Sequence, residues 1–174
     1  MIGEERVRRP AVASRRNVTI RSATSGDLGM VVALRLALLR ESSGNAIYRR
    51  LRASAAERAE QLFATQLASS SEVTFLAECD SAAVGILRCV DTAGSPLLYP
   101  SHFGYVSSVY VVQRMRRSGV LRALLTRAEA WCRDRGLHEM RLHNAVDNEV
   151  ANQTWDSLGF EPVELLRMRR LDQG

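Results

Sequence analysis

The stretch Phe103–Gly136 reads FGYVSSVYVV, then QRMRRSG, then VLRALLTRAEAWCRDRG. The first part alternates as a β-strand does. The second is a basic turn that contains Gly119, and the third has the apolar spacing of an amphipathic helix that stops at Gly136. Unpaired N–H groups and the positive end of the helix dipole coincide at the start of such a helix. The stretch therefore predicts a phosphate-binding turn between a strand and a helix.

The elements predicted around this stretch complete the order β-α-α-β-β-β-α-β-α-β. Further strands are expected at Asn17–Arg21, Val73–Glu78, Ala83–Val90, Glu139–Asn144 and Glu164–Leu171, and further helices after Thr24, from about Ser54 and at Asn148–Leu158. Thr24 and Asp27 have the spacing of a helix capping box, and Asp80 and Ser81 form a hairpin turn. An antiparallel first part followed by one β-α-β unit predicts a single α+β domain over residues 17–174. Residues 1–16 are polar and rich in arginine, so we expect a disordered basic tail there.

The charge of the chain comes from arginine alone. All 24 basic residues are arginine, and the formal net charge is +5. The absence of lysine excludes a Schiff-base lysine and the lysine of a P-loop. Arginine grips phosphates bidentately, so the basic turn keeps its capacity to bind an anion.

Other classes of function find little support. Of 174 residues, 46% are hydrophobic, but no apolar run approaches the ~20 residues of a membrane helix. The first residues lack the apolar segment of a secretory signal, so we expect a cytoplasmic protein. The three cysteines match no zinc or redox pattern, and no metal site is expected. Arginines without interleaved aromatic residues give poor support for nucleic-acid binding, although the basic tail leaves an acidic partner open.

Two motifs resemble the signatures of the GNAT acyltransferase superfamily over Val18–Leu171. The acyl-CoA signature of that family, R/Q-x-x-G-x-G/A after a valine-rich strand, stands here as Arg116 to Leu121 after Val109-Tyr110-Val111. The second signature, N-x-x-A-x-x-x-Y-x-x-x-G-F, stands as Asn148, Ala151, Trp155 and Leu158-Gly159-Phe160. Leu121 and Trp155 depart from the family pattern, because a small residue and a tyrosine usually occupy these places.

The resemblance implies a fold and a co-substrate. The fold would be a mixed, centrally splayed sheet of about six to seven strands flanked by about four helices. Acetyl-CoA would be the co-substrate, with its pyrophosphate on the turn and its pantetheine arm along the strand. The residues expected to bind it are Val109, Val111, Arg116, Arg117, Ser118, Gly119, Val120, Leu121, Arg122, Asn148 and Trp155.

The resemblance identifies the catalytic residues less specifically than the residues that would bind acetyl-CoA. His143 stands where many relatives have an acidic base, and an imidazole is a competent base at neutral pH. A histidine that only hydrogen-bonds within the sheet is the alternative interpretation. The Tyr110–Val111 region would stabilise the thioester oxygen, and Tyr105 or Tyr110 could donate a proton or simply pack. Trp155 cannot titrate, which leaves it a wall of the site or a core residue.

The sequence thus predicts an N-acetyltransferase that moves an acetyl group to a primary amine by direct attack in a ternary complex. A non-catalytic acyl-CoA-binding module is the alternative. The acceptor stays open between a small molecule and a peptide, because Glu41 would attract a cationic amine whereas Tyr48, Arg49, Arg50 and Arg52 would attract an acidic group. A homodimer is also left open.

Overall fold

The computed structural model describes residues 17–171, and the predicted tail at residues 1–16 lies outside them. The strands are β1 (Val18–Ser22), β2 (Glu72–Cys79), β3 (Ala82–Ala93), β4 (His102–Val111) and β5 (Met140–Leu142). The helices are α1 (Leu28–Glu41), α2 (Ala55–Leu67), α3 (Val120–Asp134) and α4 (Glu149–Ser157), with short 3-10 turns at Ser25–Asp27, Ser42–Gly44 and Gln113–Met115.

The five strands form one mixed sheet in the order β1-β2-β3-β4-β5. The first four pair antiparallel, and β4 pairs parallel with β5 after the α3 crossover. The β2–β3 hairpin turns at Asp80 and Ser81, both of which have positive φ. A two-residue turn needs this conformation for its twist to match that of the two strands. The predicted α+β class and the mixed sheet are confirmed.

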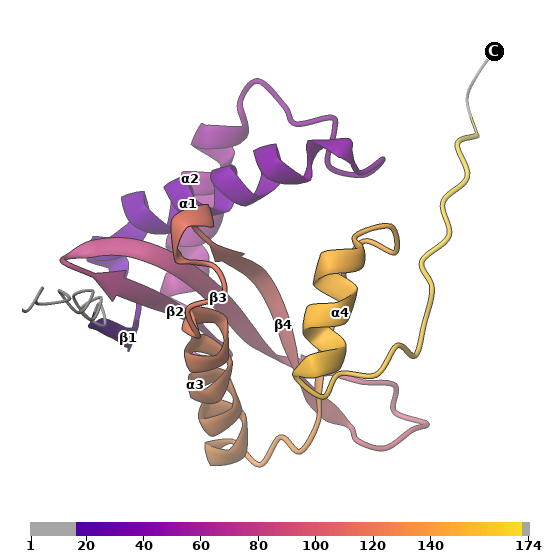
Figure 1. Cartoon of the computed structure of the whole chain (residues 1–174). Helices are drawn as coiled ribbons and strands as arrows, with labels where there is room; N and C mark the ends of the chain where they lie inside the picture. Colours follow the sequence, from indigo (N-terminus) through magenta and orange to yellow (C-terminus); the bar gives the residue numbers. More distant parts are fainter. Residues whose placement is uncertain (1–16, 172–174) are drawn as a thin grey trace, which may run out of the picture.

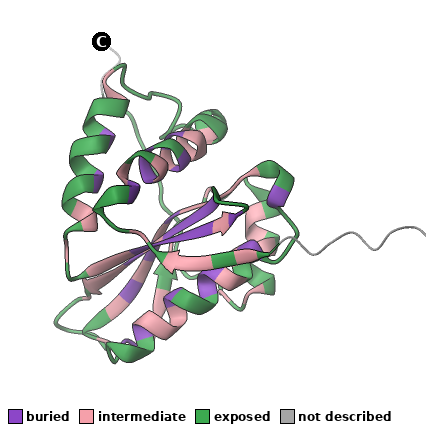
Figure 2. Cartoon of the chain, turned by 90° about the vertical axis from the view of Figure 1, so that its left-hand side faces the viewer, coloured by how far each residue is buried: buried purple, intermediate pink, exposed green. Residues whose placement is uncertain are grey.

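The sheet is covered by helices on both faces (Figure 1). On one face, Leu124, Leu125 and Ala128 of α3 pack against strand residues such as Leu87 and Val106. On the other, Val31, Val32 and Leu36 of α1 and Phe63 of α2 pack against Leu76 and Ile86. Figure 2 shows the buried residues concentrated in the strands and on the helix sides that face them. Burying each such Leu, Ile or Phe side chain contributes about 1.5–3 kcal/mol to folding.

The predicted strand at Glu164–Leu171 is wrong. Residues 160–171 contain neither helix nor strand, and those from 161 onward are exposed. A strand forms only where a neighbouring edge can accept its hydrogen bonds. The neighbouring edge strand, β5, has only three residues, so the sheet has five strands among the described residues rather than six or seven.

The three cysteines are reduced thiols in the core. Cys79, Cys89 and Cys132 are all free and buried. Cys79 pairs with Ala82 and Cys89 with Val73, so the two strand cysteines do not face each other. The Sγ atoms of Cys89 and Cys132 lie 3.6 Å apart between β3 and α3.

Candidate active site

The turn between β4 and α3 has the backbone of an anion cradle. Arg117 and Gly119 have positive φ of 59° and 87°, which reverse the chain just before Val120 begins the helix. The Ser118 hydroxyl donates to the Met115 carbonyl at 2.6 Å and stabilises this reversal. Glycine adopts the left-handed conformation without a steric penalty, which explains its presence at the N-cap.

The start of α3 presents free donors. Ala123 is the first residue whose N–H bonds back along the helix, to Gly119 O at 3.0 Å. Within residues 17–171, the N–H groups of Val120, Leu121 and Arg122 have no acceptor. These donors and the positive helix end together suit a phosphate group.

The arginines of the turn fall into two groups. Arg114, Arg117 and Arg122 are exposed and form no ion pair with any other described residue. Arg116 instead pairs with Glu41 at 2.6 Å, at the C-terminal end of α1, and its Nε–H donates to the Val111 carbonyl at 3.0 Å. The hydrogen bond to Glu41 raises the pKa of Arg116 further. The sequence did not predict this ion pair. The motif alone does not distinguish Arg116, which is paired with Glu41, from the unpaired arginines around it.

Strand β4 opens towards its free edge just before the turn. Its register with β3 shifts between Ile86 and Arg88, and Ser108 there has a φ of 54°, which together mark a β-bulge. Parallel pairing with β5 ends at Val106. Beyond it, residues 107–111 have β3 on one side and no described strand on the other. Alternate backbone groups on that side are available to an extended, peptide-like ligand.

The side chains after the bulge alternate between the two faces. Val109 and Val111 pack against the α3 cluster, whereas Tyr110 packs against the α1 and α2 cluster. The Tyr110 ring also lies 5.7 Å from the Arg116 guanidinium carbon. The three-residue step from Val106 to Val109 on one face breaks the period of two. That step was the sequence signal for the bulge, and our interpretation missed it.

His143 lies beside Tyr105. It follows β5 directly, is exposed, and its Nδ1 lies 2.9 Å from the Tyr105 hydroxyl. Burial raises the pKa of Tyr105, so this phenol stays protonated at neutral pH. The structure therefore brings His143 together with Tyr105, which the sequence treated only as an alternative to Tyr110.

The residues of the second motif stabilise α4. The Asn148 side chain accepts the Ala151 N–H at 3.1 Å and caps the helix. Trp155 is buried and meets Phe160 edge to face, with ring centroids 5.3 Å apart. Both contacts are structural, and a role of either residue in binding acetyl-CoA stays a prediction.

Metal and membrane chemistry find no support in the described residues. Residues 17–171 contain no group of three or more His, Cys, Asp or Glu side chains that could hold a metal ion. No helix within that range is long and apolar enough to cross a membrane.

These features fit the chemistry of coenzyme A. A pyrophosphate matches the free N–H groups at the start of α3, and the peptide-like pantetheine arm matches the open edge of β4. The model of the acetyltransferase (GNAT) family matches residues 40–160. The chain belongs to this family. The predicted resemblance is thereby confirmed.

Solved structures share the fold across nearly the whole chain. A predicted acetyltransferase with acetyl-CoA from Clostridium acetobutylicum has a TM-score of 0.74 at 18% identity, covering 88% of this chain and 96% of that one. An aminoglycoside 6'-N-acetyltransferase from Acinetobacter baumannii has a TM-score of 0.73 at 19% identity, covering 91% of this chain and 100% of that one. At these identities the likeness shows the fold alone.

A curated relative matches over a shorter stretch. An aminoglycoside N(6')-acetyltransferase type 1 from Acinetobacter haemolyticus is 34% identical over 64 residues. That stretch is 37% of this chain and 44% of the relative, so the chain spans less than half the length of the curated relative it matches.

Proposed function

We propose that the protein is an N-acetyltransferase that moves the acetyl group of acetyl-CoA to a primary amine. The observation that carries the proposal is the junction of β4 and α3, where a strand edge opened by a bulge leads into a helix start with unpaired N–H groups. Few ligands combine a peptide-like arm with a pyrophosphate, and coenzyme A is one of them. Family membership supports the same assignment.

Binding would divide between two surfaces of the chain. The N–H groups of Val120 to Arg122 would hold the pyrophosphate, with Arg114, Arg117 and Arg122 adding charge. Backbone groups of residues 107–111 would hold the pantetheine arm. Arg116 would act differently, by fixing the turn to α1 through Glu41.

His143 would accept the proton of the attacking amine. For this the Tyr105 hydroxyl must accept a hydrogen bond from Nδ1–H, because only then does Nε2 keep a free lone pair. A backbone N–H near Tyr110 would stabilise negative charge on the acyl oxygen. Acetyl-CoA supplies the activated acetyl group as a thioester. The amine forms a C–N bond to the acetyl carbon, the C–S bond breaks, and coenzyme A leaves as its thiolate, which needs no dedicated acid because the pKa of a thiol is about 8.5.

Release of free thiol from acetyl-CoA in the presence of an amine panel tests the proposal. Amine-dependent release with formation of the N-acetyl product supports it. Tight binding of acetyl-CoA by calorimetry without any transfer would instead support a non-catalytic acyl-CoA-binding module. The buried Trp155, at the place of the family tyrosine, favours this second candidate because it removes one proton donor.

A further inference from the structure

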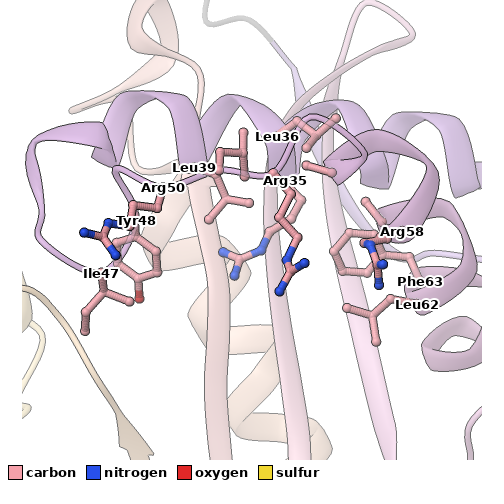
Figure 3. Close-up of a pocket in the computed structure, with 13 residues that line it drawn as sticks. Arg35, Leu36, Leu39, Ile47, Tyr48, Arg50, Arg58, Leu62 and Phe63 are labelled. Carbon is pink, nitrogen blue, oxygen red and sulfur yellow. The ribbon is translucent and has the colours of Figure 1, made fainter. Parts of the chain in front are cut away.

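A pocket opens between α1, α2 and the loop that joins them, on the sheet face opposite α3. Its volume is about 290 Å³, which suits a small molecule. Figure 3 shows Tyr48 and Arg50 at one end, Arg35 in the middle, and Arg58 with Leu62 and Phe63 at the other end.

The charged residues that line this pocket are all positive. Of the thirteen residues that line it, four are arginines and none is acidic. Arg58 donates to the Ser54 hydroxyl at 3.2 Å. The side chains of Arg35, Arg50 and Arg52 form no ion pair or hydrogen bond with any residue between 17 and 171.

The surroundings do not neutralise these arginines. Arg49 and Arg50 lower the pKa of Arg170, so the positive charge extends beyond the pocket towards the C-terminal segment. Glu41, the acidic residue that the sequence offered for a cationic acceptor, is paired with Arg116. Arg49 and Arg170 therefore add positive charge beside the pocket.

Arg35 lies in the middle of the pocket. It is half-buried on α1, and burial lowers its pKa. Its charge interacts with Tyr48, which also lines the pocket, and with Tyr105, the partner of His143. A partly desolvated guanidinium without a counter-ion is unfavourable, and a bidentate oxyanion would offset that cost.

The remaining lining is apolar. Leu36, Leu39 and Phe63 contribute to it, and the partly exposed Ile47 and Leu51 extend it towards the loop. An aromatic or aliphatic body would bury surface there while its charged end meets the arginines.

We propose that the acceptor of this acetyltransferase is an amine whose apolar body carries an oxyanion, a carboxylate or a phosphate, that binds Arg35 with Arg50 and Arg52. The inference rests on the proposed function and narrows its substrate class. A polycationic aminoglycoside, the substrate class in the names of the relatives, would be repelled by this pocket.

Matched acceptors test the inference. Tyramine phosphate is compared with tyramine, and the dipeptide Phe-Glu with Phe-glutamine amide, so that each pair differs in its oxyanions. Kanamycin serves as the polycation. We expect kcat/KM to be about tenfold or more higher for the oxyanion member, because a charge-assisted hydrogen bond contributes about 1.5–3 kcal/mol. The pair with the larger ratio distinguishes phosphate from carboxylate.

Variants of the pocket arginines test whether this preference for oxyanion-bearing acceptors comes from the pocket. Arg35→Gln and the double variant R50Q/R52Q should reduce the ratio towards one, and Arg35→Lys should retain part of it because charge remains without the planar fork. Arg40→Gln on the same helix is exposed and outside the pocket, so it should leave the ratio unchanged. Thermal unfolding of each variant confirms folding. A preference for neutral or polycationic acceptors, or a ratio that survives the pocket variants, would overturn the inference.

A binding measurement separates this inference from the proposed function. N-Acetyltyramine phosphate is titrated into the full chain by calorimetry without acetyl-CoA. Binding that Arg35→Gln abolishes supports the pocket assignment even if no amine is acetylated, in which case only the proposed function fails. Absence of binding, with transfer equal for charged and neutral acceptors, overturns the inference and leaves the proposed function intact.

Discussion

The hydroxyl of Tyr105 lies 2.9 Å from Nδ1 of His143, with the two rings tilted by 57°. This contact joins β4 to the residue that directly follows its neighbour β5. If His143 is the base, this contact would leave Nε2 as the nitrogen that faces an incoming amine.

Replacing His143 by alanine should reduce kcat by about 10²–10⁴, the usual contribution of a general base. Acetyl-CoA affinity, measured by calorimetry, should change little. His138→Ala is the matched control, because His138 is also exposed and lies five residues earlier. Full activity of His143→Ala would contradict a catalytic role and show that His143 only forms a hydrogen bond.

Tyr105→Phe should lower kcat less than His143→Ala does, because the imidazole remains but loses its orientation. The measurement is the pH dependence of kcat/KM, whose acidic limb reports the free base. A change in that limb supports a positioning role for Tyr105. An unchanged profile would show that the contact serves only packing.

Gly119→Ala should weaken acetyl-CoA binding and lower the free energy of unfolding by about 1–2 kcal/mol, the cost of a left-handed conformation. An added Cβ would meet nothing within 4 Å, so the effect would come from the backbone alone. Gly136→Ala provides the control, since Gly136 has a φ of 70° at the other end of α3. Both variants should lose stability, but only Gly119→Ala should change acetyl-CoA affinity. Equal affinities would contradict the phosphate role of the turn.

Gly104→Ala should destabilise the protein by about 1–3 kcal/mol, the usual cost of overpacking. A Cβ built on Gly104 would lie 2.5 Å from Cys132 Sγ. In a double-mutant cycle with Cys132→Ala, denaturant unfolding should show that part of this loss is recovered, because the clashing sulfur is removed. Strict additivity would show that the two residues do not share this space.

Asp27 should make stability depend on acidic pH. Arg21 holds the pKa of this carboxyl well below its usual range through two hydrogen bonds, at 2.8 and 2.7 Å. The pKa is lower in the folded state, so the stabilisation is present above the ordinary pKa near ~4 and is lost as pH falls below it. Asp27→Asn should therefore be less stable at pH 7, and its difference from the parent protein should shrink between about pH 5 and pH 2.

Urea unfolding at several pH values measures this difference. Asp134→Asn is the control, because Asp134 is exposed at the end of α3. A deficit of Asp27→Asn that stays constant over the whole pH range would argue against the ion pair as its source.

The sequence predicted those parts of the molecule that local chemistry determines. Gly119, the Asp80-Ser81 turn and the Thr24–Asp27 contact, in which the Thr24 N–H donates to Asp27 Oδ2 at 2.7 Å, all follow from neighbouring residues. Contacts between distant segments were not predicted. Arg116 and Glu41 are 75 residues apart, and no local pattern relates them. The failed strand at Glu164–Leu171 has the same origin, because its composition permits a strand but only a partner edge can form one.

In the candidate site, too, local features were predicted and the contacts between distant segments were not. The turn motif identified the residues at the start of α3, and the position of His143 was inferred from the second motif. Of the basic pocket, the sequence named Tyr48, Arg50 and Arg52 as possible contacts of the acceptor. It did not predict Arg35 or Arg58, because the pocket is lined by two helices and a loop whose relative positions the sequence does not give.

The open edge of β4 has a consequence for solubility as well as for binding. Backbone groups that lack a partner strand can pair with another chain, which is a route to aggregation. The bulge at Ser108 twists this edge and so makes it a poorer template for a flat partner strand. A bound acyl donor would cover the same groups, so the protein should resist aggregation best when its co-substrate is abundant.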